Sequence, residues 1–317
     1  MYPEVYKAFV SKLTPINLDL DVVLSYSCIL SSDFYDQLLL ATIAPALAIV
    51  TFTGSYLFAK KRNGSSDDAK RTVLYKHQAA VLYLAFFIYS PVSYKIFQTL
   101  SCDKLDDGNS YLRADYSLSC STPRHQWYKA YALIMVCVYP IGIAAVFAYL
   151  LHRYRHDLVK PHRGSVLHLK PLQGMWAAYK PSRFYYEVVE CGRRISLTAI
   201  AAFVPSNSAA QISLVLMFAV VFVFISEAIS PFEKKADMNL YRWGNAIIVT
   251  SMYVAFLGKV DVGYDTAPAM LTFSGVLILA NVFMVVTVLI QTAFLVKALR
   301  GTREGVRELD APVRRTV

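Results

Sequence analysis

Charged residues are scarce in this sequence. They make up 17% of its 317 residues, whereas about a quarter is usual in a soluble globular domain. Hydrophobic residues account for 56%, and the mean hydropathy is +0.40. Several apolar runs reach the roughly 20 residues that cross a bilayer core. The low charge excludes an ordinary soluble domain and predicts an all-α, polytopic helical bundle whose constant partner is the lipid bilayer.

The sequence also lacks the short motifs of catalysis and cofactor binding. It contains no glycine-rich phosphate loop, HExxH pair, nucleophile elbow or pair of catalytic acids. His152 and His156 lie four residues apart, but the arginines around them in HRYRH favour solvated residues over a metal site. We therefore expect no enzymatic activity, cofactor or metal centre. The net charge of +10 fits basic loops better than a nucleic-acid partner.

Hydropathy predicts one membrane domain, residues 34–296, with seven helical spans. It follows an exterior segment, residues 1–33, that lacks a signal peptide because acids interrupt it and no basic leader precedes an apolar core. A basic tail, residues 297–317, ends the chain. The seven spans have these approximate bounds: 36–58, 79–100, 128–151, 184–204, 209–229, 243–257 and 267–296.

Lys and Arg concentrate in every second connecting segment, which predicts the orientation. They follow the first, third, fifth and seventh spans, whereas alternate segments such as CDKLDDGNSYLRAD carry most of the acids. Cytosolic loops are enriched in Lys and Arg, so the N-terminus is expected outside and the C-terminus in the cytosol. The expected location is the plasma membrane, with an organellar membrane as the alternative.

Cysteines are few, and their positions agree with this orientation. Cys102 and Cys120 share one exterior loop, so a disulfide between them is our first expectation, because exterior sites are oxidising. Spacing alone leaves Cys28 open as a partner of either. Cys137 and Cys191 fall within predicted spans and are expected to be reduced and buried.

The fourth span contains the charged stretch EVVECGRR. Only the ten residues 195–204 separate it from the turn VPSNS, and ten helical residues extend about 15 Å, half the hydrocarbon thickness. The span must therefore include Glu187, Glu190, Arg193 and Arg194. These residues fall within an arc of about 120° on one helix face, and Glu190 can reach both arginines. A charge at the bilayer centre costs about 2.5–3.5 kcal/mol, so we expect paired charges on a protected face.

This charge network has two interpretations. It is either a structural ion-pair network or the polar lining of an ion or substrate path. Glu227, near the inner end of the fifth span, is a possible partner or an interfacial residue. Asn281, Thr287 and Gln291 recur along the seventh span, where either a pathway or hydrogen-bonded helix contacts would explain them.

Two further features concern backbone and interface. Pro91 and Pro140 predict kinks in the second and third spans. Before the fourth span, four apolar or aromatic residues recur at helical spacing. They indicate either a short helix in the inner headgroup layer or a linker packed on the bundle: Leu172, Met175, Trp176 and Tyr179.

Several motifs resemble the TRP-like membrane domain of protist and algal proteins. They are SYLRADYSLSC, YPIGI, YKPSRFYYEVVECGRRISLTAI and the downstream SPFE, and the similarity runs from about Pro3 to Val260. In that family an earlier span and a cysteine-rich or EGF-like exterior region come first, so the seven spans here would be its later ones. The resemblance implies cation passage across a membrane, by a homo-oligomer or a subunit of a larger complex.

Other classes of membrane protein fit less well. A seven-helix receptor is a third possibility, but the seventh span has no lysine for a retinal Schiff base and no NPxxY-like stretch. The loop after the fourth span also lacks the cysteine that such receptors use. A carrier would show an inverted repeat, which the segments do not. The leading expectation is an ion channel or ion-transporting bundle, and the runner-up is a membrane anchor or subunit.

Overall fold

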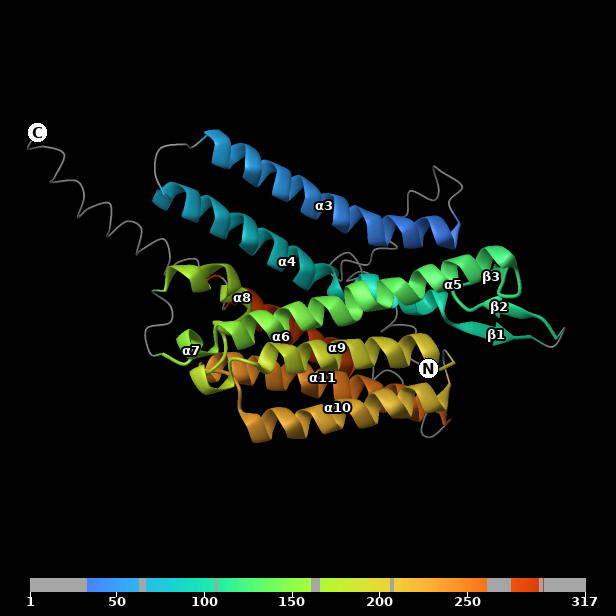
Figure 1. The fold of residues 1–317 in the computed structure, drawn as a ribbon. Coiled ribbons are helices and arrows are strands. Elements are labelled where there is room, and N and C mark those ends of the chain that lie inside the picture. The colour runs from blue at the N-terminus through green and yellow to red at the C-terminus, as the bar shows by residue number, and fades with distance from the viewer. Residues whose placement is uncertain are drawn as a thin grey trace, which may run out of the picture. The chain divides into compact units, whose positions relative to one another are not determined.

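The computed structural model describes residues 33–62, 67–105, 108–160, 166–205, 208–260, 275–290 and 293. Among them, residues 33–235 belong to one compact unit and the later ones to a second, and each unit is described by itself. The described chain is mostly helical (Figure 1).

The first unit begins with long apolar helices. Helix α3 (Phe34–Arg62) and helix α4 (Asp67–Thr99) form a hairpin and lie side by side (Figure 1). A third long helix follows in three continuous parts. They are α5 (Pro123–Val136), the π-helical segment η3 (Cys137–Ile143) and α6 (Ala144–Arg153).

Short helices then lead into a second pair of longer ones. The short elements are α7 (Arg155–Leu158), η5 (Leu167–Leu172), α8 (Gln173–Trp176) and η6 (Pro181–Arg183). Helix α9 (Tyr186–Phe203) packs against α4, α6 and α10 (Ala209–Ile229). The second unit contains α11 (Lys235–Lys259) and the helix Gly275–Ile290.

Six of the seven predicted spans fall on described helices, and the seventh does so over residues 275–290, but the helices differ in character. Over the described residues, four are long and apolar enough to cross a membrane: Phe34–Phe58, Lys70–Thr99, Pro123–Arg153 and Ala209–Ile229. Their length and composition indicate a multi-pass membrane protein. Helix α9 is 18 residues long and carries the charged cluster, α11 is more polar, and Gly275–Ile290 is shorter.

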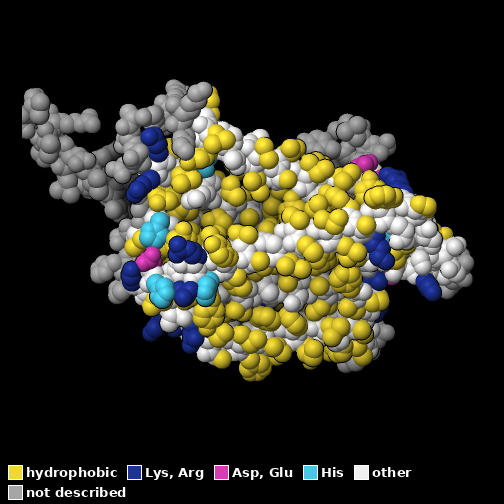
Figure 2. All heavy atoms as spheres, viewed as in Figure 1, with side chains coloured by type: hydrophobic (Ala, Val, Ile, Leu, Met, Phe, Trp, Pro, Cys, Tyr) yellow, Lys and Arg dark blue, Asp and Glu magenta, His cyan; other side chains and the backbone are white. Residues whose placement is uncertain are grey.

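Outward-facing apolar side chains agree with a lipid environment. Hydrophobic side chains cover the face shown in Figure 2, over α5, α6 and α10, whereas Lys, Arg and His gather at the end near α7. Leu47 on α3, Ile134 on α5 and Phe224 on α10 are exposed by 59%, 61% and 70%. Large apolar residues exposed on several helices form a surface that is unfavourable in water and suited to contact with lipid.

A small β-sheet corrects the all-α expectation. Strands β1 (Cys102–Lys104), β2 (Ser110–Leu112) and β3 (Asp115–Ser119) form an antiparallel sheet in the order β1-β2-β3. Cys102 pairs with Leu112, and Tyr111 with Ser119. The predicted Cys102–Cys120 disulfide is confirmed and closes this loop. The alternative partner, Cys28, lies outside the described residues.

The kink predicted in the third span takes the form of the π-helical segment η3. Pro140, which lacks a backbone N–H, lies in its middle. Such segments are rare, and many occur at functional sites. Gly142 is required here, since a Cβ at this position would lie 2.9 Å from the backbone oxygen of Cys137.

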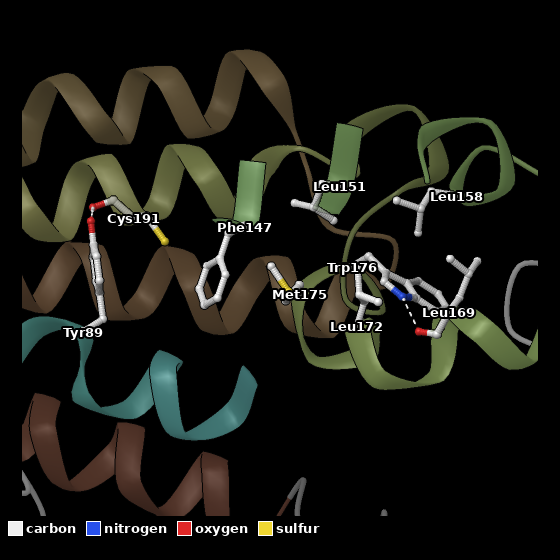
Figure 3. Close-up of a cluster of buried hydrophobic side chains, with 9 residues drawn as sticks. All are labelled: Tyr89, Phe147, Leu151, Leu158, Leu169, Leu172, Met175, Trp176 and Cys191. Carbon is white, nitrogen blue, oxygen red and sulfur yellow. Dashed lines mark hydrogen bonds between the residues drawn. The ribbon is translucent and has the colours of Figure 1, made fainter. Parts of the chain in front are cut away.

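The largest buried cluster joins α4, α6, α9 and the short helices (Figure 3). Trp176 is 5% exposed, and its indole N–H donates to the carbonyl of Leu169 at 3.2 Å. Leu172 and Met175 are also buried in the cluster. For this segment, burial favours the packed linker over a helix lying in the headgroup layer. Its aromatic residues point into protein.

Candidate functional site

Helix α9 places the predicted charge cluster in its N-terminal half. At 1.5 Å per residue its 18 residues extend about 27 Å, close to the hydrocarbon thickness. The helix begins at Tyr186, so Glu187 lies in its first turn. The apolar stretch from Ile195 to Phe203 completes it. Its uncharged half alone would extend only about half the hydrocarbon thickness.

The two acids are buried and the two arginines are partly exposed. Glu187 and Glu190 are each 3% exposed, whereas the side chains of Arg193 and Arg194 are 16% and 29% exposed. Both Nε and Nη2 of Arg193 bind Oε2 of Glu190, at 2.9 and 2.8 Å. Nη2 of Arg194 lies 3.7 Å from Oε1 of Glu187, and its guanidinium lies over the ring of Phe86, 4.5 Å from the centroid.

This arrangement differs from the sequence expectation in one pairing. The predicted i,i+3 contact of Glu190 with Arg193 is present. The guanidinium of Arg194, which was expected to reach Glu190, lies beside Glu187, seven residues earlier in the chain. Two helical turns separate this second pair, which explains its longer distance. Oε1 of Glu187 is buried and accepts no hydrogen bond from the described residues. The site therefore contains one carboxylate oxygen that is poorly satisfied.

The other oxygen of Glu187 is bound by Tyr179, which precedes α9 and was not predicted to be part of the cluster. The hydroxyl of Tyr179 donates to Oε2 of Glu187 at 2.8 Å. Burial raises the pKa of Tyr179, and the adjacent Glu187 charge raises it further, so this hydroxyl stays protonated as a donor. The ring packs against Tyr186 and Phe232, with centroids 5.4 and 5.2 Å away.

A backbone contact fixes Tyr179 in place. The N–H of Lys180 donates to the carbonyl of Pro231 at 2.8 Å, and the N–H of Glu233 donates to the carbonyl of Ala178 at 2.9 Å. The motifs YKPSRF and SPFE, separated by about fifty residues of sequence, are thus adjacent. Ser230 turns the chain toward this contact with a left-handed φ of 46°.

The opposite end of α9 is capped by the disulfide-closed sheet. Arg113 donates from Nη1 to the carbonyls of Ala202 and Val204, at 2.9 and 3.0 Å. Its Nε and Nη2 bind Asp103, the shorter distance being 2.7 Å. The hydroxyl of Ser101 also donates to Ala202, at 2.8 Å. A cation at a helix C-terminus satisfies unpaired carbonyls and the helix dipole together.

Sequence reasoning missed Arg113 as a site residue. Its hydrogen bonds hold the pKa of Asp103 below its usual range, and the hydroxyl of Tyr116 lowers it further. The available signal was LRAD in the motif SYLRADYSLSC, because an arginine is unexpected in an acidic exterior loop. Only the fold shows that it reaches α9.

The remaining predicted residues lie on other helices or outside the described part of the chain. Glu227 is exposed in the last turns of α10. In the second unit, Asn281 and Thr287 donate to carbonyls of their own helix four residues earlier, those of Leu277 and Phe283. Gln291 lies outside the described residues.

A second polar cluster lies beside the disulfide. The buried His125 contacts the hydroxyl of Tyr35 through Nδ1 at 2.9 Å, and its Nε2 lies 3.7 Å from Sγ of Cys102. The sulfurs of Cys102 and Cys120 and the imidazole lie within 4.8 Å of one another. Three such groups are potential zinc ligands, but both sulfurs are bonded to each other.

Together these observations define a class of protein: a mostly helical chain with four long apolar helices and a buried acid–arginine cluster beside them. No protein-family model matches the chain, and no curated protein or solved structure is detectably similar to it. The acid–arginine cluster is therefore the feature of this chain that bears most directly on its function.

Proposed function

We propose that this chain is a seven-span membrane protein that conducts or transports cations, with α9 as the electrostatic centre. The resemblance to TRP-like membrane domains and the basic segments support this topology, with the N-terminus outside and the C-terminus cytosolic. We further propose that the working form is a homo-oligomer in the plasma membrane. Four apolar helices support the membrane setting.

The observation that carries the proposal is the buried carboxylate pair on α9. Glu187 and Glu190 lie inside the protein on a helix that reaches across most of a bilayer. Charged residues inside a membrane are costly, and they commonly mark ion or substrate paths. Oε1 of Glu187 accepts no hydrogen bond from the described chain, so it has lone pairs to offer a dehydrated cation.

The arginines give this site a working cycle. Without a cation, Arg193 and Arg194 neutralise the two acids, which lets the helix lie in lipid at tolerable cost. Both guanidinium groups are partly exposed, so each is able to swing away while the acids stay in place. A passing cation then replaces a guanidinium at the carboxylate, and net charge in the cluster changes little.

One set of observations favours a second function, a structural membrane subunit. Arg193 binds Glu190 through two nitrogens, and Tyr179 ties Glu187 to the segment before α9. The disulfide-closed sheet would then be an exterior docking surface for a partner protein. In this function the cluster locks α9 in the bundle and passes nothing.

Flux measurements on purified protein in liposomes separate the two functions. Cation flux above that of empty liposomes is expected, with altered selectivity or gating in Glu187→Gln and Glu190→Gln. The matched control is Asp36→Asn, because Asp36 is an exposed acid in the first turn of α3. Absence of flux from folded protein under varied voltage, tension and calcium, with a stoichiometric co-purifying partner, would establish the subunit function instead.

A further inference from the structure

A cavity of about 500 Å³ lies in the first unit between α3, α4 and the segment around η5. Phe52 of α3, Val81 and Leu82 of α4 and Leu172 of η5 form its apolar wall. Volumes of 300–1,000 Å³ with mostly apolar walls are typical of small-molecule sites. The cavity is separate from the charge cluster on α9, so it needs its own explanation.

The cavity has a polar end. Tyr56, His77, Tyr154 and His168 also line it. Both ring nitrogens of His77 face oxygen atoms, with Nδ1 2.8 Å from the carbonyl of Val73 and Nε2 3.0 Å from the hydroxyl of Ser55. That hydroxyl is itself within 2.8 Å of the carbonyl of Phe52. These contacts hold the His77 ring between α3 and α4. An occupant must therefore be apolar over most of its length and polar at one end.

The charge around this end is positive. Between residues 150 and 183, Asp157 is the sole acidic residue of the sequence, amid several lysines and arginines. Lys160 binds Asp157 at 2.6 Å and so balances its charge, and His168 contacts the other carboxylate oxygen at 2.9 Å. Arg153 lies 5.8 Å from the ring centroid of Tyr154 on the cavity wall. Figure 2 shows Lys, Arg and His gathered at this end of the unit.

The surrounding helices place the cavity beside lipid. Its walls come from two of the helices that are apolar enough to cross a membrane, near their basic ends at Arg62 and Lys70. By the distribution of Lys and Arg, this is the cytosolic side. An apolar cavity at that depth favours acyl chains over water, and clustered basic residues attract anionic headgroups.

We propose that this cavity binds an anionic phospholipid of the cytosolic leaflet. Its acyl chain packs between Phe52, Val81 and Leu172, and its phosphate lies at the polar end, where Arg153 supplies positive charge. This site rests on membrane insertion but not on ion conduction, so a protein that conducts nothing would still bind the lipid.

Lipid retention tests the proposal. Purified full-length protein is exchanged into mixed micelles holding equal amounts of phosphatidylglycerol and phosphatidylcholine with identical chains, and retained lipid is quantified by mass spectrometry. Phosphatidylglycerol is expected in excess by about fivefold, the effect of one basic residue near a lipid surface. Equal retention of the two lipids would overturn the proposal. So would displacement of the bound lipid by soluble glycerophosphate alone, which would identify a phosphate site.

Two matched pairs of variants locate the bound lipid. Thr53→Trp fills the cavity and is expected to abolish the excess, whereas Thr51→Trp, on the same helix but outside the cavity wall, keeps it. Arg153→Gln is expected to reduce the preference between headgroups, whereas Arg124→Gln, at the opposite end of the continuous α5–α6 helix, leaves it unchanged. Unchanged retention in folded Thr53→Trp would overturn the proposal, and if that variant fails to fold, the Arg153 and Arg124 pair decides.

Discussion

At the residue scale, the α9 cluster shows what sequence spacing predicts and what it misses. The pairing of Glu190 with Arg193 follows from helical geometry, so it was predictable. The contact of Tyr179 with Glu187 crosses from a loop into a helix and depends on the packed SPFE turn. The burial of both carboxylates likewise depends on neighbouring elements. Local spacing predicts partners within a helix, and tertiary packing determines the rest.

Removal of the Tyr179 hydroxyl tests its role as a donor. Tyr179→Phe would leave Oε2 of Glu187 without this hydrogen bond in a buried site. We expect a loss of about 1–3 kcal/mol in the free energy of unfolding, the penalty for a buried polar group without its partner. Thermal or denaturant unfolding in detergent measures the change. Tyr149→Phe, at a 65% exposed position, serves as the control and should lie within about 0.5 kcal/mol of the wild type. Equal losses in the two variants would show that the Glu187 contact contributes nothing specific.

Asp103 makes the exterior sheet sensitive to acid. Its pKa is lowered in the folded protein, chiefly by Arg113. The stability that this pairing contributes is therefore complete above the ordinary pKa of an aspartate, about 4, and is lost as the pH falls through the lowered value. We expect Asp103→Asn to reduce stability at pH 7 and to flatten its dependence on pH below about 4. If the stability of Asp103→Asn fell below pH 4 as steeply as that of the wild type, this assignment would be contradicted.

At the element scale, the helices were predictable but their irregular parts were not. Apolar runs near 20 residues located the four long apolar helices of the described chain. The three strands each have five residues or fewer, too short for alternation to register as a pattern. Pro140 predicted a kink, but the π-helical form also requires Gly142 and the neighbouring carbonyl of Cys137.

Gly142 therefore provides a sharp test of the η3 segment. In Gly142→Ala the new Cβ would lie 2.9 Å from the backbone oxygen of Cys137, so the π-helical turn must shift. We expect a loss of about 1–3 kcal/mol in the free energy of unfolding. Gly192→Ala in α9 is the control, because nothing lies within 4 Å of its new Cβ. Alanine favours helix by about 0.5–1 kcal/mol, so the control should be neutral or stabilised. Similar effects in both variants would argue against steric strain at η3.

Arg113 tests the coupling between the exterior sheet and α9. Arg113→Ala removes the donor to the carbonyls of Ala202 and Val204 and leaves Asp103 without its cation. We expect the C-terminal turn of α9 to exchange amide hydrogen faster, because its carbonyls lose their cap. Hydrogen exchange with mass spectrometry measures peptides that cover residues 195–204. Arg124→Ala, in another partly exposed ion pair of the same face, is the control. Unchanged exchange in Arg113→Ala would show that the sheet does not restrain this helix.

At the scale of the whole molecule, the question is how the chain is threaded through the membrane. An odd number of spans places the two ends on opposite sides. Four spans alone would place the termini on one side, and they would leave the short connection between α9 and α10 without a membrane role. The proposed fourth span, α9, therefore decides between the two topologies, because its charged half must enter the lipid region.

Labelling of single cysteines decides the threading. In a background with Cys28→Ser, Cys137→Ala and Cys191→Ala, the native disulfide remains intact. Ser117→Cys on β3 should react with an impermeant maleimide applied to intact cells, and His156→Cys on α7 only after permeabilisation, because the Lys- and Arg-rich segments face the cytosol.

The decisive position is on α9 itself. Val189→Cys, one residue before the buried Glu190, should resist the reagent from both sides, since the helix crosses the lipid region with its acids inside. The control is Ser208→Cys, in the short turn before α10, which should react from outside. Reaction of Val189→Cys at the same rate as His156→Cys would place the acids in the cytosol. The cation path proposed for α9 would then have no route across the membrane.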